Sequence, residues 1–389
     1  MYEIIVFILV LSFLVLIHEM GHYLLARKNK INIKEFGLGY PPRILKLFTY
    51  QGTIFSLNAI PFGGFVQLEG ENGPEDHKKI DQTKNHKKTD QTKKSDQQWG
   101  PFFSKSIPAR LQTLLAGVFF NFIFGIVAFS IIFTQTGIPV DLGEQARIYE
   151  LRADSPAASA GMKENTNIVG FYSEFDQQWV TVNNITEVQD YVDAHLGEQV
   201  IVKTTETCEI TDCPDSYQEF EVYLRKDAER AESEGAMGVV FTSVIYEENP
   251  WYLAIIKGSI YGFKEAIMLG FLILEALGNL IIDLVNGRSV AMDVAGPVGI
   301  VHQAQTYGFF DGGFLNILSF AALLSINLGV MNLLPIPALD GGRAFFILLE
   351  KVITKKKIEK VANWANYIGF FILILLMIFV SVNDVMQLF

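Results

Sequence analysis

An apolar run from Ile4 to Ala26 contains three ionisable side chains within five residues, in the sequence His18-Glu19-Met20-Gly21-His22. The run is long enough to cross a bilayer as a helix. Ionisable groups inside such a helix are costly unless they are paired or used, so they predict a functional site. This feature constrains the fold more than any other, because the chain must satisfy these groups at membrane depth.

The spacing of this cluster points to a metal site. On a helix, His18 and His22 share one face, so both imidazoles can bind one ion. Glu19, beside the first histidine, can act as a base toward water. This H-E-x-x-H arrangement is typical of zinc hydrolases. The same pattern also occurs by chance, and single histidines on helices are usually packed residues, but the apolar setting favours the metal interpretation.

Charge and composition predict a membrane protein with a water-facing part. Half of the 389 residues are hydrophobic, which is typical of several membrane spans. Residues 141–250 hold 23 Asp/Glu and 7 Lys/Arg, a net charge of −16 against −11 for the whole chain, so the remainder carries +5. An acidic block between apolar blocks favours an extracytoplasmic domain. Nothing in the composition indicates nucleic-acid binding. Cys208 and Cys213 lie in this block, where a disulfide and a free pair both fit.

Basic residues orient the first helix. The N-terminus lacks the basic start and the cleavage site of a signal peptide. Four lysines and arginines between Arg27 and Lys34 follow the apolar run instead. Because basic residues stay in the cytoplasm, the first helix runs from outside to inside, and His18 and His22 lie in its cytoplasmic half.

Residues 36–70 alternate turn signals with short apolar pieces and end in Pro61-Phe62-Gly63-Gly64-Phe65, a pattern that predicts hairpin strands. These strands could form a small cytoplasmic sheet. They could also form a hairpin that dips toward the active site, where its edge pairs with an unwound substrate strand. Residues 71–100 are polar and repeat Asp-Gln-Thr-Lys at 81 and 90, which predicts a disordered cytoplasmic loop.

A second span is expected at Leu111–Phe133, and it contains Asn121. An intramembrane asparagine most often holds helices together, and a role near the metal site is the alternative. This span returns the chain to the outside, ahead of the acidic block.

The acidic block, at 142–245, predicts a compact α+β module, with a helix at Thr186–Leu196 and strands around 198–202 and 220–224. Its segment Ser155–Met162 matches the S-P-A-x-x-A-G-[ML] element of PDZ domains, which the module resembles. The resemblance implies binding of peptide or protein termini by strand addition, and a role as plug or spacer is the alternative.

Residues Trp251–Val285 are apolar enough to suggest a span, but the number of membrane crossings argues against one. If they crossed, Asp340 and Lys355-Lys356-Lys357 would lie outside, against the positive-inside rule. We therefore expect helices lying on the outer membrane face. The third span is then Phe314–Leu334 and the fourth Tyr367–Val382.

At the inner end of the third span stands the segment Asn332-Leu-Leu-Pro335-Ile-Pro337-Ala-Leu-Asp340-Gly-Gly. Asp340 could cap a helix, the usual role of Asp before Gly. It could also be a third metal ligand, since two histidines and one carboxylate leave an open position for water. Its expected depth, on the same side as His18 and His22, favours the ligand.

These motifs in this order resemble the site-2 protease family of intramembrane metalloproteases, in particular the bacterial regulator of sigma-E protease branch. The resemblance covers nearly the whole chain except 71–100. It implies one Zn²⁺ per chain, bound by His18, His22 and Asp340, with Glu19 as the catalytic base. It also implies a membrane-re-entrant hairpin near Pro61–Phe65. Substrate contact is implied for the hairpin residues Phe62, Gly63 and Gly64 and for Asn332, Pro335 and Pro337. Two departures are a single PDZ domain in place of a tandem pair, and the polar insert.

The expected protein is therefore an α-helical membrane protein with four transmembrane helices, a cytoplasmic-side β-hairpin and an extracytoplasmic α+β PDZ domain. Its expected parts are 1–70, 71–100, 101–137, 142–245, 246–312 and 313–389. We expect a zinc-dependent intramembrane endopeptidase in the bacterial cytoplasmic membrane, with its active site near the cytoplasmic face. Its expected partners are the lipid bilayer and single-span membrane proteins, of the anti-sigma factor or remnant signal peptide type. A metal-ion transporter and a non-catalytic PDZ scaffold are the alternatives.

Overall fold

The computed structural model describes residues 2–71, 99–141, 145–206, 217–230, 234–247, 249–286 and 296–388. The chain divides into two compact units, which we call the helical unit (Met1–Gln135 with Pro250–Phe389) and the acidic unit (Thr136–Asn249). The repeated Asp-Gln-Thr-Lys sequence and both cysteines lie outside the described residues, so the predictions for them stay predictions.

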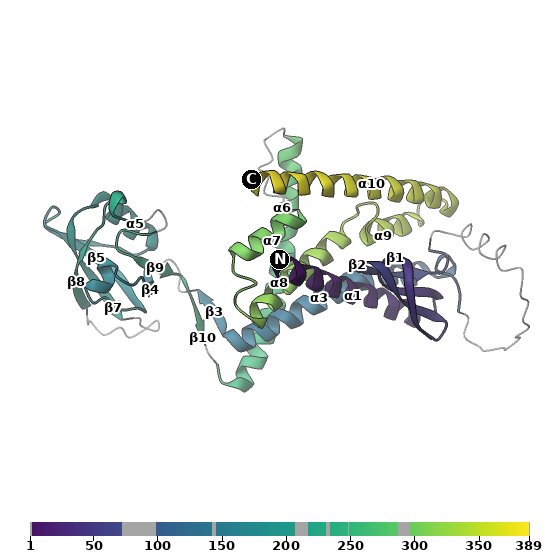
Figure 1. Ribbon diagram of the computed structural model, residues 1–389, viewed down its shortest axis with the longest axis horizontal. Helices are drawn as coiled ribbons and strands as arrows, with labels where there is room; N and C mark the ends of the chain where they lie inside the picture. Colours follow the sequence, from purple (N-terminus) through teal and green to yellow (C-terminus); the bar gives the residue numbers. More distant parts are fainter. Residues whose placement is uncertain are drawn as a thin grey trace, which may run out of the picture. The chain divides into compact units, whose positions relative to one another are not determined.

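Long apolar helices build the helical unit (Figure 1). They are α1 (Tyr2–Lys28), α3 (Ile107–Thr136), α6 (Trp251–Val285), α7 (Pro297–Thr306), α8 (Phe314–Leu333), α9 (Asp340–Leu349) and α10 (Lys355–Leu388), with a short 3-10 helix at Phe102–Ser104. Among the described residues, five of these helices are long and apolar enough to cross a membrane: α1, α3, α6, α8 and α10.

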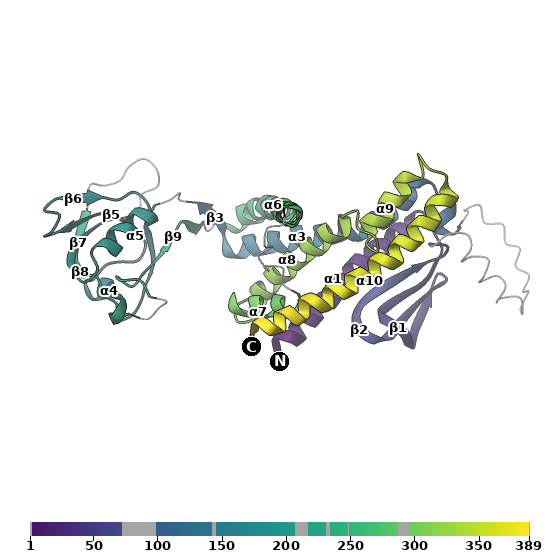
Figure 2. The ribbon, with the colours of Figure 1, turned by 90° about the horizontal axis from the view of Figure 1, so that it is seen from above.

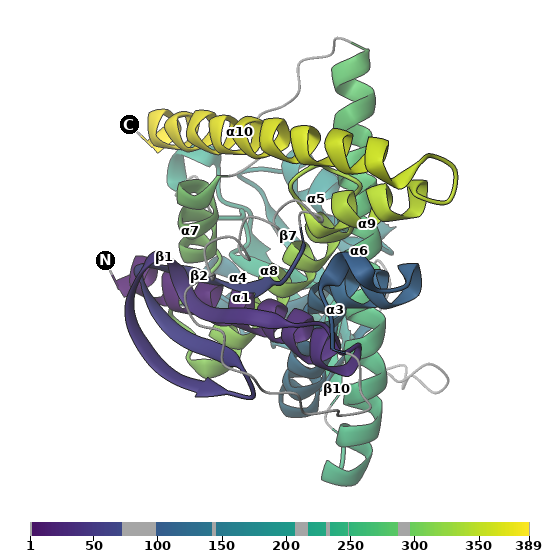
Figure 3. The same ribbon diagram turned by 90° about the vertical axis from the view of Figure 1, so that its right-hand side faces the viewer.

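Helix α6 is the fifth, where four spans were expected. The expectation placed several helices on the membrane surface at 251–285, but the structure has one continuous helix there. It runs across the direction of α1 and α10 rather than alongside them (Figure 3). Where α6 crosses α3, a Cβ on Gly262 would lie 2.4 Å from the Ser130 backbone nitrogen. Length and composition permit α6 to span, while its direction sets it apart from α1 and α10.

One hydrophobic core of the helical unit forms where α3, α6 and α8 pack together. Its buried residues include Phe129 of α3, Ala266 of α6 and Ile326 of α8. Small residues at these contacts let the helix backbones approach closely, which is the usual basis of packing between apolar helices. This core places α3 beside α8, and both helices lead to the segments that build the candidate site.

A long antiparallel hairpin packs against α1 (Figure 2). Its strands are β1 (Ile33–Tyr50) and β2 (Thr53–Leu68), with Tyr50 opposite Thr53 at the turn. The ring of Tyr23 on α1 lies 5.7 Å from Phe36 and 5.6 Å from Phe55, centroid to centroid. The hairpin predicted from residues 36–70 is therefore present, and this aromatic cluster fixes it beside the first helix.

In its described residues, the acidic unit is an antiparallel sheet with two α-helices and a short 3-10 helix. Its sheet has the strand order β8-β7-β5-β4-β9, and β6 pairs with β5. These elements are β4 (Arg147–Leu151), α4 (Pro156–Ser159), β5 (Thr166–Ser173), β6 (Trp179–Thr181), α5 (Ile185–Ala194), β7 (Gln199–Glu206), β8 (Tyr217–Tyr223), a 3-10 helix (Asp227–Glu229) and β9 (Val239–Thr242). A separate ribbon pairs β3 (Ile138–Asp141) with β10 (Val244–Glu247). The helix and strands expected in this block are present.

The acidic unit has its own hydrophobic core. Ile148, Phe171 and Val202 from the sheet are buried against Val188 of α5. Ser155 caps α4, its hydroxyl accepting a hydrogen bond from the Ala158 amide at 3.2 Å. A closed core of this kind is what an independently folding domain requires.

Candidate metal centre

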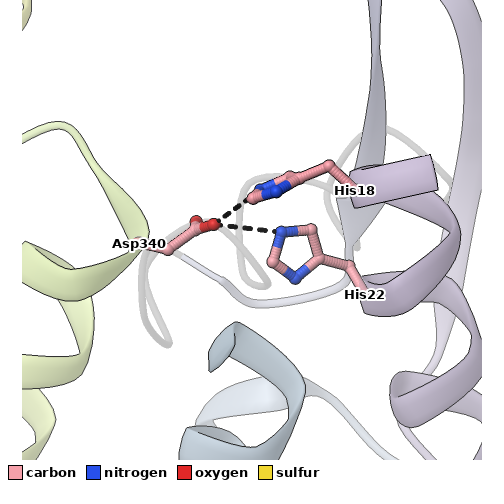
Figure 4. A group of neighbouring side chains, drawn as sticks. All are labelled: His18, His22 and Asp340. Carbon is pink, nitrogen blue, oxygen red and sulfur yellow. Dashed lines mark hydrogen bonds and ion pairs between the residues drawn. The ribbon is translucent and has the colours of Figure 1, made fainter. Parts of the chain in front are cut away.

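Three side chains from the two ends of the chain converge at one point. His18 Nε2 lies 2.9 Å from Asp340 Oδ2, and His22 Nε2 lies 3.1 Å from the same oxygen. Both imidazoles project from α1 toward Asp340 at the start of α9 (Figure 4). One ligand atom from each residue lies within 4.8 Å of the others, and both histidines are buried. The four-residue spacing on α1 thus places both rings on the face that meets Asp340.

Groups on α3 orient the two imidazoles. The Thr113 carbonyl lies 2.8 Å from His22 Nδ1, which donates to it and leaves Nε2 as the free nitrogen. The Asn121 amide lies at the other ring, 3.1 Å from His18 Nδ1; with its oxygen turned to this nitrogen it accepts the Nδ1 hydrogen and leaves Nε2 available for a metal. Outer partners of this kind fix the ring orientation and tautomer of metal-binding histidines. Asn121, which could have been only a link between helices, therefore lies beside the histidine.

A glycine on α3 makes room for both rings. A Cβ on Gly117 would lie 2.6 Å from His18 Nε2 and 2.6 Å from His22 Nε2. Atoms that close would collide, so any side chain here would occupy the space where the imidazole nitrogens converge. Gly117 and Asn121 are four residues apart and therefore face the site together.

The turn after α8 presents Asp340. Two glycines follow the aspartate, and a Cβ on Gly342 would lie 2.1 Å from the Ile336 carbonyl oxygen. Only glycine permits the chain to fold back this tightly over the first turn of α9. Asp340 is the first residue of that helix, so the turn and the helix together aim its carboxylate at the histidines.

Glu19 faces a cavity of about 590 Å³ that is lined largely by hairpin residues. Glu19, His22, Asp340 and Arg343 line it, together with Gly64 and neighbouring hairpin residues. The Val66 amide of β2 donates a hydrogen bond to the Glu19 carboxylate. Arg343, on the first turn of α9, forms an ion pair with Glu71 at the same cavity. The base candidate is thus held beside the histidines with open space in front of it.

The donor set fits a zinc ion. Two imidazole Nε2 atoms and one carboxylate oxygen converge, both Nδ1 atoms have outer partners, and the Gly117 face keeps the space between them clear. Zinc in hydrolases takes such a three-residue set and keeps a fourth position open. The cavity beside Glu19 is also lined by two of the three candidate ligands, His22 and Asp340.

Comparison with known proteins gives the family. The model of peptidase family M50 matches residues 6–376. The chain belongs to peptidase family M50. It is 30% identical over 386 residues to a putative zinc metalloprotease of Clostridium acetobutylicum, covering 99% of this chain and 97% of the relative. It is also 28% identical to the zinc metalloproteases RasP of Geobacillus kaustophilus and Oceanobacillus iheyensis, covering 100% of this chain and 98% and 100% of theirs.

The other site residues expected for an M50 protein fall into two groups. Gly64 lines the cavity, and a Cβ on Gly63 would touch Tyr40 and Val15; the side chain of Phe62 is outside the described set. Asn332 instead donates to the Leu328 carbonyl within α8 at 3.0 Å. Neither Asn332, Pro335 nor Pro337 is among the described residues that line the cavity. The structure therefore brings the hairpin glycine to the site, and leaves Asn332 in the last turn of α8 and the two prolines in the turn that follows.

Sequence reasoning missed several neighbours of this M50 site. The Gly117-x-x-x-Asn121 spacing could have revealed the α3 face, since both residues share one side of a helix. Arg343, one turn after Asp340, could have been found in the same way. The Thr113 carbonyl gave no signal, because any residue carries a carbonyl and only the crossing of α1 with α3 selects this one.

Proposed function

We propose that this chain is a zinc-dependent intramembrane endopeptidase of the site-2 type. The convergence of His18, His22 and Asp340 beside Glu19 carries the proposal. The names of the relatives agree with it, since they are called zinc metalloproteases. His18, His22 and Asp340 would hold one Zn²⁺, and Glu19 would be the base.

The roles of the residues follow from their positions. Bound zinc supplies a Lewis acid that polarises a peptide carbonyl and acidifies water. Glu19 takes the proton from the attacking water and passes it to the leaving amine, since it faces the cavity from beside the first ligand. Thr113 and Asn121 keep the imidazoles oriented while the proton moves. The cavity is lined by Glu19, His22 and Asp340, so water can reach the site from the side that Glu19 occupies.

The hairpin supports cleavage of an extended substrate. A helix hides its amide bonds in its own hydrogen bonds, so a transmembrane substrate must unwind locally before hydrolysis. The β2 segment Gly64–Leu68 lines the cavity directly in front of Glu19. A strand edge there offers backbone groups to which an unwound segment could bond. Single-span proteins, of the anti-sigma factor or remnant signal peptide type, are the proposed substrates.

We propose four membrane-crossing helices, α1, α3, α8 and α10, with α6 lying along the outer face. The direction of α6 across α1 and α10 supports this (Figure 3), and so does the basic segment at the start of α10. The site then lies near the cytoplasmic face of the bacterial membrane, and the acidic unit lies outside. The parts at 1–70, 101–137 and 313–389 would form the membrane-embedded core.

The acidic unit is proposed to be a PDZ domain that binds peptide or protein termini. Strand β9 ends the described sheet order, next to β4. An edge strand is the position at which a peptide adds to such a sheet. The two proposed roles of the acidic unit can be distinguished, because peptide binding requires a ligand with a free chain end and a plug does not.

The experiment is cleavage of a single-span protein by the purified enzyme in detergent. We expect zinc-loaded wild type to cleave, and chelation to stop it. Glu19→Gln should lower kcat by at least about a hundredfold, the usual contribution of a general base, while zinc content stays near one per chain. Glu3→Gln, at the start of the same helix, is the matched control and should keep full activity.

The outcomes separate the proposal from its alternatives. Unchanged cleavage by Glu19→Gln would refute the mechanism. Zinc-dependent metal flux in liposomes without any cleavage would favour the transporter. Protein that binds neither zinc nor cobalt would favour the scaffold.

A further inference from the structure

The segment that carries Asp340 is a strained turn. Between α8 and α9 the chain passes through Pro335 and Pro337, which have no amide to donate. Ala338 then adopts a φ of +78°. This left-handed conformation is unfavourable for alanine, because its Cβ crowds the following carbonyl. Something outside the turn must hold it, since Asp340 follows only two residues later.

Helix α10 supplies that support. The Ala338 amide donates a hydrogen bond to Asn366 Oδ1 on α10 at 3.0 Å. One turn further along α10, a Cβ on Gly369 would lie 2.7 Å from the Pro337 carbonyl oxygen and 2.8 Å from the Pro337 Cβ. The Pro337–Ala338 peptide therefore rests on the backbone of α10 at Gly369 and is bonded to Asn366. An amide side chain at membrane depth is costly without such a partner.

We infer that Asn366 is a positioning residue of the metal centre: with Gly369 it fixes the Pro337–Ala338 turn and so sets how firmly Asp340 holds a metal. This rests on the proposed role of Asp340 as a ligand. Asn366 touches neither the metal ligands nor the cavity in the described structure. Its effect must pass through Ala338, and this distinguishes it from a residue that only fastens α10 to the body of the protein.

A second substitution that restores metal binding can distinguish these two roles of Asn366. If Asn366 holds Ala338 in the left-handed region, glycine at 338 should need less support, because glycine adopts that region readily. Ala338→Gly should therefore restore part of what Asn366→Leu removes. If Asn366 only fastens α10, Ala338→Gly has nothing to restore and adds flexibility.

The readout is metal affinity of the purified full chain in detergent, from the absorption of bound Co²⁺ and competition with a chelator. We expect Asn366→Leu to weaken binding about tenfold to a hundredfold, the usual effect of losing an outer partner. Asn366→Asp keeps the acceptor and should stay closer to wild type. The double variant Asn366→Leu with Ala338→Gly should regain a substantial part of the loss. Tyr367→Leu, an exposed neighbour on α10, should bind as wild type.

Several results would overturn the inference. Unchanged affinity in Asn366→Leu would do so, and so would a double variant no better than the single one. If Asn366→Leu does not fold, Gly369→Ala tests the same contact, and unchanged affinity there counts equally against it. Asp340→Ala tests the proposed function separately: unchanged metal binding in that variant removes Asp340 from the ligands, whatever Asn366 does.

Discussion

At the scale of single residues, the candidate site depends as much on an absent side chain as on its ligands. Gly117 leaves the space in which the Nε2 atoms of His18 and His22 converge. A methyl group in that space would push both rings away from Asp340. The neighbouring polar partners, Thr113 and Asn121, could not correct this, because they hold the opposite nitrogen of each ring.

Gly117→Ala is therefore expected to weaken metal binding at least about tenfold and to abolish peptidase activity. The fold should survive, because alanine favours a helix by about 1 kcal/mol over glycine. Co²⁺ titration and circular dichroism measure the two effects. Gly278→Ala on α6, where a Cβ meets nothing within 4 Å, is the matched control. Wild-type affinity in Gly117→Ala would show that the rings do not need this space.

Whether a site residue can be predicted from the sequence depends on the residue itself. His18, Glu19, His22 and Asp340 carry side-chain chemistry at recognisable spacings, so they could be named before the structure. Asn366 acts through its contact with a distant segment, and nothing in its own neighbourhood marks it. Asn332 shows the opposite case, because its amide bonds to Leu328 in its own helix rather than facing the cavity.

At the scale of elements, a buried ion pair joins α3 to α9. Arg110 at the start of α3 contacts Glu350 at the end of α9, with Nη1 2.8 Å from Oε1. Their side chains are only 6% and 9% exposed. Removing one partner of a buried pair leaves an uncompensated charge, whereas replacing both by apolar groups avoids it. The pair thus links α3, which orients the histidines, to α9, which begins with Asp340.

Arg110→Met is expected to destabilise the protein by about 3–5 kcal/mol, and adding Glu350→Met should recover most of the loss. Thermal unfolding in detergent measures both. Arg230→Met, which breaks a pair with the exposed Asp227, is the control and should cost under about 1 kcal/mol. A double variant as unstable as Arg110→Met alone would mean that packing, rather than charge, holds these helices.

Elements were easier to predict than their directions. Hydropathy located α1, α3, α8 and α10, and turn residues located the hairpin, since both signals are local. Local signals do not give the orientation of a helix in the membrane. The segment 251–285 could therefore be placed only by counting how often the chain crosses the membrane. Its continuous form and its path across α3 depend on small residues such as Gly258 and Gly262, which meet their partners only in three dimensions.

At the scale of the whole molecule, the two units have separate cores and separate chemistry. In the acidic unit, Asp176 accepts hydrogen bonds from Tyr191 at 2.7 Å and Ser173 at 3.1 Å, and lies 3.3 Å from His195. The Tyr191 hydroxyl is the largest cause that lowers the pKa of Asp176. Burial, and then the bond to Asp176, raises the pKa of Tyr191 to about 12.

These shifts predict the pH dependence of the acidic unit. A lowered carboxyl pKa adds stability above its unfolded value of about 3.9, and this stability is lost as pH falls through the folded value. The raised tyrosine pKa adds stability below about 10, which is lost as pH rises toward 12. Tyr191→Phe should weaken the dependence of stability on pH on both the acid and the alkaline side.

Denaturant unfolding of the separately expressed Thr136–Asn249 unit, at a series of pH values, measures this change. Loss of the hydrogen bond should cost about 1 kcal/mol near neutral pH. Tyr149→Phe, at an exposed tyrosine, should leave the acid-side and the alkaline-side dependence of stability unchanged. Identical stability profiles against pH for wild type and Tyr191→Phe would show that the Tyr191–Asp176 hydrogen bond does not cause these pKa shifts.

The distance along the chain between the ligands has a consequence for biosynthesis. His18 and Asp340 are 322 residues apart, and chains are made from the N-terminus. The acidic unit can fold while the third ligand has not yet been translated. During most of its synthesis the nascent chain therefore carries only the two histidines, which makes it a weak metal binder and an inert peptidase. Under the proposed function, completing the site late would keep the peptidase from acting on the unfinished helices of its own chain.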